Sequence, residues 1–260
     1  MPALRRGLRV LQALAGRPGP VSAAALARDL GLPRSTVYEL LSELAAAGFA
    51  VHLPDTRRWG LGLAAFEVGS AFLRGQPLER LAGPVLARLS AATAATAHLG
   101  VLHGAQTLYL AKERPLRGPS LVTEVGVRLP AALTATGLSM LAALPAAQVR
   151  TLFPDPGAFV IRTGRGVRTL PELRDRLAAI RRRGWAVEDG EVSPDTASIA
   201  APVFDHNGMP IAAIGVTVPH RCPAGPADPA GCGLDLAGFA TVVRSATAGL
   251  TAAIGGRGPR

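Results

Sequence analysis

The sequence is poor in aromatic residues, lysine and cysteine. Aromatic side chains form only 4% of the 260 residues, so the hydrophobic 48% must build its core mainly from alanine, leucine and valine. Lys112 is the only lysine, yet basic residues outnumber acidic ones by 28 to 18, for a formal charge of +10. This sign favours a polyanionic partner over an acidic protein surface. The length predicts two domains.

The two cysteines and the lack of long apolar runs predict a soluble, cytoplasmic protein. Cys222 and Cys232 lie in the stretch HRCPAGPADPAGCG, without a CxxC motif or a histidine at metal-binding spacing. We expect two free thiols in a reducing cytosol, although a flexible loop leaves a disulfide open. No apolar run reaches the roughly 18 residues of a membrane helix. Arg9 and Gln12 interrupt the first leucines, which argues against a signal peptide.

Motifs of catalysis are also missing. GLSML at 137–141 is not the G-x-S-x-G elbow of hydrolases, and GRG at 164–166 lacks the third glycine of a dinucleotide loop. His98 and His103 lie five apart on a predicted strand, which directs them to opposite faces and excludes a shared metal site. The sequence therefore predicts no catalytic residue, no metal site and no cofactor.

The first 63 residues have the order of a winged helix-turn-helix. A first helix is suggested by apolar residues at helical spacing, namely Leu4, Leu8, Leu11 and Ala15. Ser22 is placed to cap a helix over 23–30, which Gly31 ends before the next helix starts near Pro33. The following stretch, FAVHLPDTRRWGLG, alternates, turns at Pro-Asp-Thr and returns as a second strand. This hairpin is the predicted wing.

The helix LPRSTVYELLSELAAAG carries the candidate DNA-binding face. One stripe is apolar, formed by Val37, Leu40, Leu41 and Leu44. The remaining surface offers short polar, basic and aromatic groups that can contact phosphates or base edges in the major groove. Together with the wing tip, the candidate DNA-binding residues are Arg34, Ser35, Thr36, Tyr38, Ser42, Arg57 and Arg58. Two alternatives stay open. Ser35 and Thr36 can simply cap the helix, and Arg57 and Arg58 can lie in a solvated turn without contacting DNA.

Glu39 is an acidic residue on this otherwise suitable face. Its carboxylate can accept a hydrogen bond from a cytosine amino group. It can equally pair with Arg34 or repel wrong sequences. The sequence assigns it no single role.

The remainder predicts one linker helix and an α+β domain. An amphipathic helix over 62–75 is followed by Gln76-Pro77, which breaks the chain. A hairpin turns at Gly104-Ala105, and a second turns at His206-Asn207-Gly208. Mixed helices and hairpins indicate an antiparallel sheet. Helices are predicted over 77–95, 134–144, 171–184 and 234–254, and strands in 97–103, 106–114, WAVED, SIAAPVF and PIAAIGVTV.

Three stretches together resemble the IclR family of bacterial transcriptional regulators, nearly from end to end. They are VSAAALARDLGLPRSTVYELLSELAAAGF with the wing LPDTRRWGLG, then RLPAALTATG, then RGWAVEDGEVSPDTASIAAPVFDHNGMPIAAIGVTVP. The resemblance implies a winged helix-turn-helix DNA-binding domain over 1–61, a linker helix over 62–76, and a GAF-like effector-binding and oligomerisation domain over 77–260. It also implies a homodimer or homotetramer on palindromic operator DNA, controlled by a small molecule.

The resemblance also implies an effector pocket. Its residues would be Thr134, Ala135, Thr136, Gly137, Glu188, Asp189, Ser198, Gly215 and Thr217. A helix N-terminus and several hydroxyls suit a small carboxylate or aromatic metabolite. Ser198 stands where many members have cysteine, and Ala132 and Leu138 replace a frequent histidine and lysine. These changes favour a less charged, more apolar ligand, and a pocket that binds nothing stays open as the alternative.

The sequence therefore predicts a ligand-responsive transcriptional regulator rather than an enzyme. The alternative from a different class is a cytoplasmic ligand-sensing module whose winged helix serves protein contacts or dimerisation. DNA binding would distinguish the two roles if the slope of log K against log salt concentration were several units, because such a slope indicates contacts with phosphates.

Overall fold

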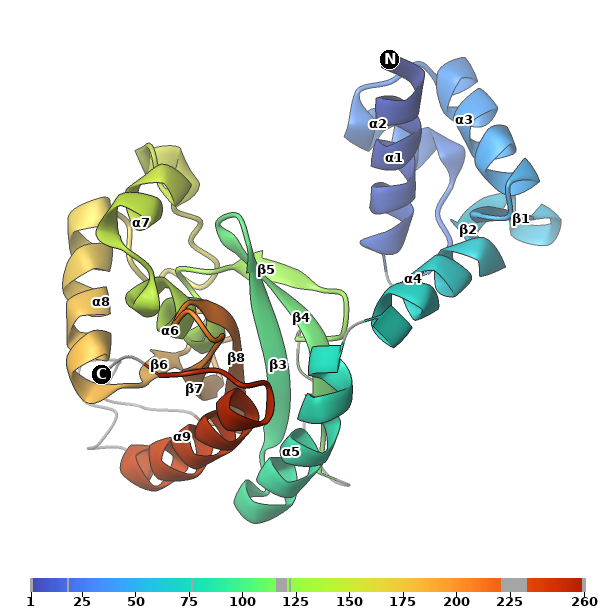
Figure 1. Ribbon diagram of the computed structural model, residues 1–260. Coiled ribbons are helices and arrows are strands. Elements are labelled where there is room, and N and C mark those ends of the chain that lie inside the picture. The colour runs from blue at the N-terminus through green and yellow to red at the C-terminus, as the bar shows by residue number, and fades with distance from the viewer. Residues whose placement is uncertain are drawn as a thin grey trace. The chain divides into compact units, whose positions relative to one another are not determined.

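The computed structural model describes residues 2–17, 19–75, 77–115, 121, 123–220 and 233–258 (Figure 1). The chain divides into two compact units, residues 1–76 and 77–260. Cys222 and Cys232, whose pairing the sequence leaves open, lie outside the described residues. Within the described ranges, none of the helices combines the length and apolar content that a bilayer span requires.

The first unit is a helical trio followed by a two-stranded wing and one further helix, as predicted. The Ser22 side chain accepts a hydrogen bond from the Ala25 N–H at the start of the second helix, and Gly31 ends that helix with φ 64°. A β-bridge between Val21 and Trp59 ties the start of this helix to the wing. The elements are α1 Pro2–Ala15, α2 Ala23–Leu30, α3 Arg34–Ala46, β1 Ala50–Leu53, β2 Arg58–Leu61 and α4 Leu63–Gly75.

The buried face of α1 differs from the predicted stripe. Leu4 and Leu8 are 62% and 50% exposed, whereas Val10 and Leu14 are buried against α2 and α3. The leucine pattern predicts the helix correctly, and the structure shows which of its residues are buried. Val10 is the residue that the leucine count leaves out, and it is fully covered in the core.

The second unit is built on a six-stranded antiparallel sheet with strand order β5-β4-β3-β8-β7-β6. Both predicted hairpins are confirmed, since β3 pairs with β4 and β7 pairs with β8. The sequence analysis missed the short strand β5 and the helix α7. The strands are β3 Thr96–His103, β4 Gln106–Glu113, β5 Arg128–Pro130, β6 Ala186–Asp189, β7 Thr196–Phe204 and β8 Pro210–Pro219.

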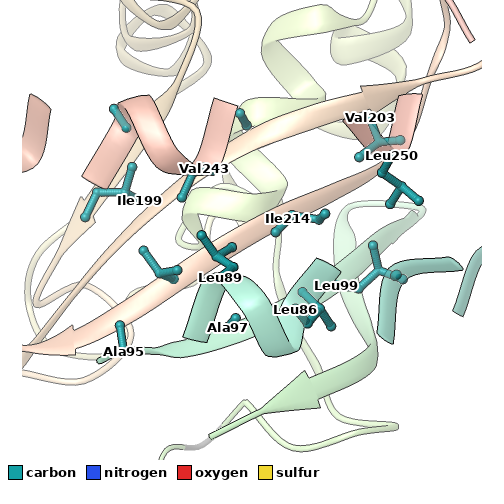
Figure 2. Packing of buried hydrophobic residues seen from close by; sticks show 14 of the residues in the cluster. Leu86, Leu89, Ala95, Ala97, Leu99, Ile199, Val203, Ile214, Val243 and Leu250 are labelled. Carbon is teal, nitrogen blue, oxygen red and sulfur yellow. The ribbon is translucent and has the colours of Figure 1, made fainter. Parts of the chain in front are cut away.

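Helices cover both faces of this sheet. Figure 2 shows Leu86 of α5 and Val243 of α9 packed with the strand residues Ile199 and Ile214. The neighbouring Ala200 lies in a second buried cluster, with α6 and α8, because successive strand residues point to opposite faces. The helices are α5 Pro77–Thr93, α6 Ala135–Ala143, α7 Ala146–Leu152, α8 Leu170–Arg183 and α9 Leu236–Ala253. The predicted α+β class is confirmed.

Helix α6 lies unusually close to the chain that precedes it. Thr134 caps the helix by accepting a hydrogen bond from the Gly137 N–H at 3.0 Å, and it also bonds Thr107 of β4 at 3.0 Å. A Cβ on Gly137 would overlap the carbonyl oxygen of Ala131 and would lie 2.6 Å from Thr107 Oγ1. Glycine is therefore required at position 137 because a Cβ has no room there. Backbone conformation is not the reason, since the φ of Gly137 is not positive.

We expect Gly137→Ala to lower the free energy of unfolding by about 1–3 kcal/mol, because the added methyl group overpacks a close contact. Urea unfolding of the full chain measures this. Gly249→Ala in α9 is the matched control, since nothing lies within 4 Å of its Cβ position. That variant should gain about 0.5–1 kcal/mol from helix propensity. Equal stability of Gly137→Ala and wild type would show that α6 can shift freely.

Candidate functional site

The exposed face of α3 carries the polar residues that the sequence singles out. Val37 and Leu41 are buried in the core of the first unit. Tyr38 is 51% exposed, and Arg34, Ser35, Glu39 and Ser42 are exposed as well, while Thr36 is half-buried. Pro33 occupies the N-cap position and provides no capping hydrogen bond, so Ser35 and Thr36 lie inside the first turn rather than at the cap. Their hydroxyls are thus not needed to begin the helix.

The wing presents two arginines in different environments. Arg57 is exposed at the tip, where the backbone adopts φ 51° after the short turn Pro54–Thr56. Arg58 is exposed too, but its guanidinium donates to the Pro20 carbonyl at 3.4 Å. Arg58 also lines an open hollow beside the start of α2, together with Arg17 and Ser22. Sequence analysis did not select Arg17, which pairs with Asp29.

A small, largely closed cavity lies in the second unit between the sheet and the start of α6. The centre of a water molecule can occupy a volume of about 20 Å³ in this cavity, so the cavity holds one or two waters. The cavity is lined by His98, Tyr109, Leu121, Thr123, Thr134, Ala135, Glu188, Val192, Ser193, Thr196, Ser198 and Thr217. Strands β3, β4, β6, β7 and β8 all contribute to it.

Of the predicted pocket residues, the structure brings together one group at the cavity, formed by Thr134, Ala135, Glu188, Ser198 and Thr217. The other four lie outside its lining. Thr136 bonds the Tyr109 hydroxyl at 3.3 Å, and Gly137 packs on Ala131. Gly215 lies against His98 in the sheet.

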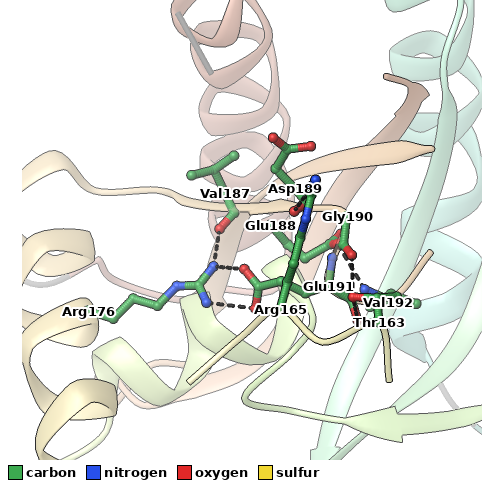
Figure 3. Close-up of polar contacts among 9 residues, drawn as sticks. All are labelled: Thr163, Arg165, Arg176, Val187, Glu188, Asp189, Gly190, Glu191 and Val192. Carbon is green, nitrogen blue, oxygen red and sulfur yellow. Dashed lines mark hydrogen bonds and ion pairs between the residues drawn. The ribbon is translucent and has the colours of Figure 1, made fainter. Parts of the chain in front are cut away.

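Asp189 lies on the other side of strand β6 from Glu188, as the alternation of strand side chains requires. Its carboxylate is buried and lies 3.8 Å from the Nε2 atom of His220. Figure 3 shows Asp189 pointing away from the Glu191 side of the strand. It therefore contributes to a different environment from the cavity.

Sequence reasoning missed the imidazole and the phenol of this cavity. His98 was considered only as a metal ligand, and Tyr109 was not considered at all. Both are almost fully buried, and their rings meet edge to face with centroids 5.2 Å apart. The only available signal was their place on the two predicted strands around Gly104, since those strands pair in the observed hairpin. In the described part of the chain, no group of three or more histidine, cysteine or acidic side chains is arranged to hold a metal.

Two polar atoms in the cavity wall lack hydrogen-bond partners among the described residues. They are Nδ1 of His98 and Oγ1 of Thr123, whose side chains belong to residues only 1% and 6% exposed. Burial, and then the charge of Lys112, lower the pKa of His98 to about 3, so its ring is neutral at physiological pH. Burial likewise raises the pKa of Tyr109. Buried polar atoms without partners are costly, and a bound molecule can supply the missing hydrogen bonds.

Among the described residues that line the cavity, Glu188 is the only acidic one. Its Oε1 atom accepts hydrogen bonds from the backbone N–H groups of Glu191 at 2.7 Å and Val192 at 3.0 Å. Burial raises the pKa of Glu188 to about 7, although these hydrogen bonds oppose the shift. Beside it, the hydroxyls of Ser198 and Thr217 share a hydrogen bond of 2.9 Å.

The loop after β6 is fastened from outside by charged and polar contacts (Figure 3). Arg176 of α8 forms a two-pronged bond with the Glu191 carboxylate, at 2.6 and 2.7 Å, and donates to the Val187 carbonyl at 2.8 Å. Thr163 donates to the Gly190 carbonyl at 2.6 Å. These contacts hold the loop backbone whose N–H groups, at Glu191 and Val192, donate to Glu188 on the cavity side.

Two family models match the chain. The IclR helix-turn-helix domain matches residues 3–54, and the bacterial transcriptional regulator IclR C-terminal domain matches residues 70–222. The chain belongs to the IclR family. It is thus an IclR-type transcriptional regulator, with a helix-turn-helix DNA-binding domain and a C-terminal effector-binding domain, as the sequence predicted.

Relatives of known sequence and structure agree with this IclR assignment. The HTH-type transcriptional regulator BhcR of Paracoccus denitrificans is 33% identical over 217 residues, which cover 84% of this chain and 77% of that protein. The IclR transcriptional regulator from Alicyclobacillus acidocaldarius has a TM-score of 0.81 at 22% identity, covering 98% of this chain and 99% of that one. An IclR homologue from Microbacterium hydrocarbonoxydans, complexed with 4-hydroxybenzoate, has a TM-score of 0.77 at 23% identity, covering 97% and 98%. These two structures share the fold.

The pKa of Glu188 makes a prediction for the stability of this IclR-family chain. Because the folded state raises this pKa from 4.5 to about 7, it binds an extra proton in this interval, and stability falls as the pH rises. We expect the free energy of unfolding of wild type, measured relative to Glu188→Gln, to fall by on the order of 3 kcal/mol between pH 4.5 and 8.

Urea unfolding of both proteins across this range measures the difference. The contribution of His98 has the opposite sign, since stability is lost as the pH falls from 6.5 towards 3, but it is common to both proteins and cancels. The exposed Glu113→Gln is the control and should follow wild type. Parallel curves for wild type and Glu188→Gln would contradict the raised pKa.

Proposed function

We propose that this IclR-family regulator binds double-stranded operator DNA with helix α3 in the major groove. This proposal rests on the two sides of α3: one side is buried, at Val37 and Leu41, and the other is polar and exposed. Arg34 and Ser35 stand at the start of the helix, where contacts with phosphates or guanine are within reach of a docked helix. Thr36, Tyr38 and Ser42 continue the row as candidates for base and backbone contacts.

The wing arginines are proposed to contact the DNA backbone or the minor groove. Arg57 is exposed at the tip, and the charge of its guanidinium is free of any ion pair among the described residues. Arg58 is held near Pro20, which places it beside Arg17 in the hollow at the start of α2. A hollow lined by two arginines at the start of a helix suits a phosphate.

The second unit is proposed to bind the effector in the cavity between the sheet and α6. The unpartnered atoms of His98 and Thr123 support this role, because both residues line the cavity. The homologue from Microbacterium hydrocarbonoxydans holds 4-hydroxybenzoate, which supports a small-molecule effector for this chain as well. Since the cavity has room only for one or two waters, its lining must move apart on binding. Such a coupled movement is how an effector changes affinity for DNA.

The regulator is proposed to act as a homodimer or homotetramer in the cytoplasm, where its DNA target lies. Leu63 and Phe66 are three residues apart on one side of α4 and are 70% and 71% exposed. Large exposed apolar side chains of this kind mark association surfaces. Pairing of α4 with its copy would set the spacing of two half-sites on a palindromic operator.

DNA binding is tested first at the wing. Arg57→Asn keeps the left-handed backbone, which asparagine tolerates, and removes one phosphate contact. We expect binding to an operator selected from a random library, and to random DNA, to weaken equally, with the slope of log K against log salt flatter by about 0.9. Arg114→Asn, at an exposed arginine of the second unit, is the charge-matched control.

The same titrations with Tyr38→Ala test the helix. Loss of a base contact should reduce discrimination between operator and random DNA by about 1–3 kcal/mol, while the salt slope stays nearly unchanged. Equal losses on both DNAs would remove Tyr38 from the specificity-determining residues. Absence of any salt-dependent DNA binding by wild type would instead favour a protein-contact role for the winged helix.

Association through α4 is tested by adding a charge to its apolar side. Phe66→Glu should shift the protein towards monomer in light scattering and weaken binding to the palindromic operator more than to a single half-site. Val68→Glu is the matched control, since Val68 is 58% exposed on the opposite side of the same helix. An unchanged mass for Phe66→Glu would place the interface elsewhere.

A further inference from the structure

The described lining of the effector cavity contains no arginine or lysine. Its polar groups are the neutral imidazole of His98, the phenol of Tyr109, several hydroxyls and the carboxyl group of Glu188. A ligand carboxylate that enters this space meets no full positive charge that would compensate for its desolvation. The N-terminus of α6 supplies only the partial charge of its backbone N–H groups.

We infer that the cavity selects an uncharged molecule that carries hydroxyl, carbonyl or amide groups, and that Glu188 is the residue that excludes carboxylates. The inference rests on the proposed effector role of the cavity and names its ligand class. The preference for an uncharged ligand follows from this lining, in which the one carboxyl group of Glu188 lies among neutral hydrogen-bonding groups.

Among the described residues that line the cavity, none carries a positive charge that would compensate for the charge of Glu188. On its own loop, Glu191 is a second acid, but its carboxylate is already engaged by Arg176. Strands β3 and β4 contribute His98 and Tyr109, both uncharged at neutral pH. Helix α6 contributes Thr134 and Ala135, which carry no charge.

The described cations near this loop bond other groups, and Arg162 donates to the Val192 carbonyl at 3.4 Å. Arg165 donates to the Asp189 carbonyl at 3.5 Å, outside the cavity lining. Lys112 forms a salt bridge of 2.7 Å with Glu124. A second carboxylate beside an ionised Glu188 would therefore be repelled, as like charges at a shared buried site are.

The unpartnered atoms fit a neutral ligand. The ring of His98 carries one proton, so Nδ1 either donates or accepts one hydrogen bond, and the Thr123 hydroxyl can do both. An amide or alcohol offers donors and acceptors together and satisfies both atoms without bringing a charge into the sheet. The Oε1 atom of Glu188 is occupied by the loop N–H groups, so a ligand would meet its second carboxyl oxygen beside the Ser198 hydroxyl.

The test uses the full chain and three matched pairs of probes: acetamide with acetate, propionamide with propionate, and 4-hydroxybenzamide with 4-hydroxybenzoate. Binding is measured by calorimetry and by the shift in Tm at pH 6 and pH 8. With a pKa of about 7, Glu188 goes from roughly nine-tenths protonated to one-tenth between these values. We expect at least one amide to bind equally at both pH values, and its acid to bind about tenfold more weakly at pH 8.

Two variants locate the effect. Glu188→Gln keeps an oxygen for the loop N–H groups and removes the charge, so the acid should bind it equally at both pH values. The exposed Glu113→Gln should retain the tenfold dependence of wild type. Thr123→Val keeps the shape of the side chain and removes its hydroxyl, so amide binding should weaken roughly 2- to 12-fold, as loss of one hydrogen bond predicts.

Several outcomes would overturn the inference. Acids that bind wild type as tightly as amides at pH 8 would show that Glu188 does not select, while the effector role of the cavity would stand. The inference would also fail if none of the amides bound at either pH while an acid did, and the effector role of the cavity would again stand. Amide binding that Thr123→Val and Glu188→Gln leave unchanged, and that does not alter operator affinity, would instead remove the cavity from the proposed function itself.

Discussion

The close contact between helix α6 and the adjoining chain is the constraint on which the second unit depends. Gly137 has no Cβ, so the helix can approach Ala131 and Thr107, and Thr134 at its cap bonds across to the sheet. This approach brings the start of α6 over the face where His98, Ser198 and Thr217 emerge. The cavity thus lies between the start of α6 and the six-stranded sheet, where the two do not pack fully against each other. Hydroxyls line it because a helix cap and strand threonines meet there.

Burial then fixes the electrostatic character of that cavity. It moves the pKa of His98 down and the pKa of Glu188 up, because in each case the charged form loses its hydration. Both shifts favour neutral groups near physiological pH. The Arg176–Glu191 pair holds the loop from outside, so that the cavity itself need not contain a strong ion pair. Its lining thus combines neutral hydrogen-bonding groups with the one carboxyl group of Glu188.

The first unit works by a different principle. Its helix α3 has a buried stripe and an uncovered row, and both follow from local periodicity and from the cap and glycine that start and end the preceding helix. Membership of the IclR family gives this row its meaning, since transcriptional regulators of this family use a helix-turn-helix to bind DNA. We propose that Tyr38 is among the side chains that determine which bases are preferred, and the structure assigns Glu39 no single role.

The sequence by itself determined the elements that local patterns encode. The apolar stripe of α3, the Ser22 cap, Gly31 and the two hairpins all arise from residues close together in the chain, and hydrophobic spacing of that kind is legible without a structure. Tertiary structure alone decided which face of α1 is buried, and which hydroxyls open onto the cavity. His98 and Tyr109 reach Glu188, Ser198 and Thr217 only because β3 pairs with β8, far along the chain. Such a meeting leaves no local pattern, since it depends on strand order and on how closely α6 packs.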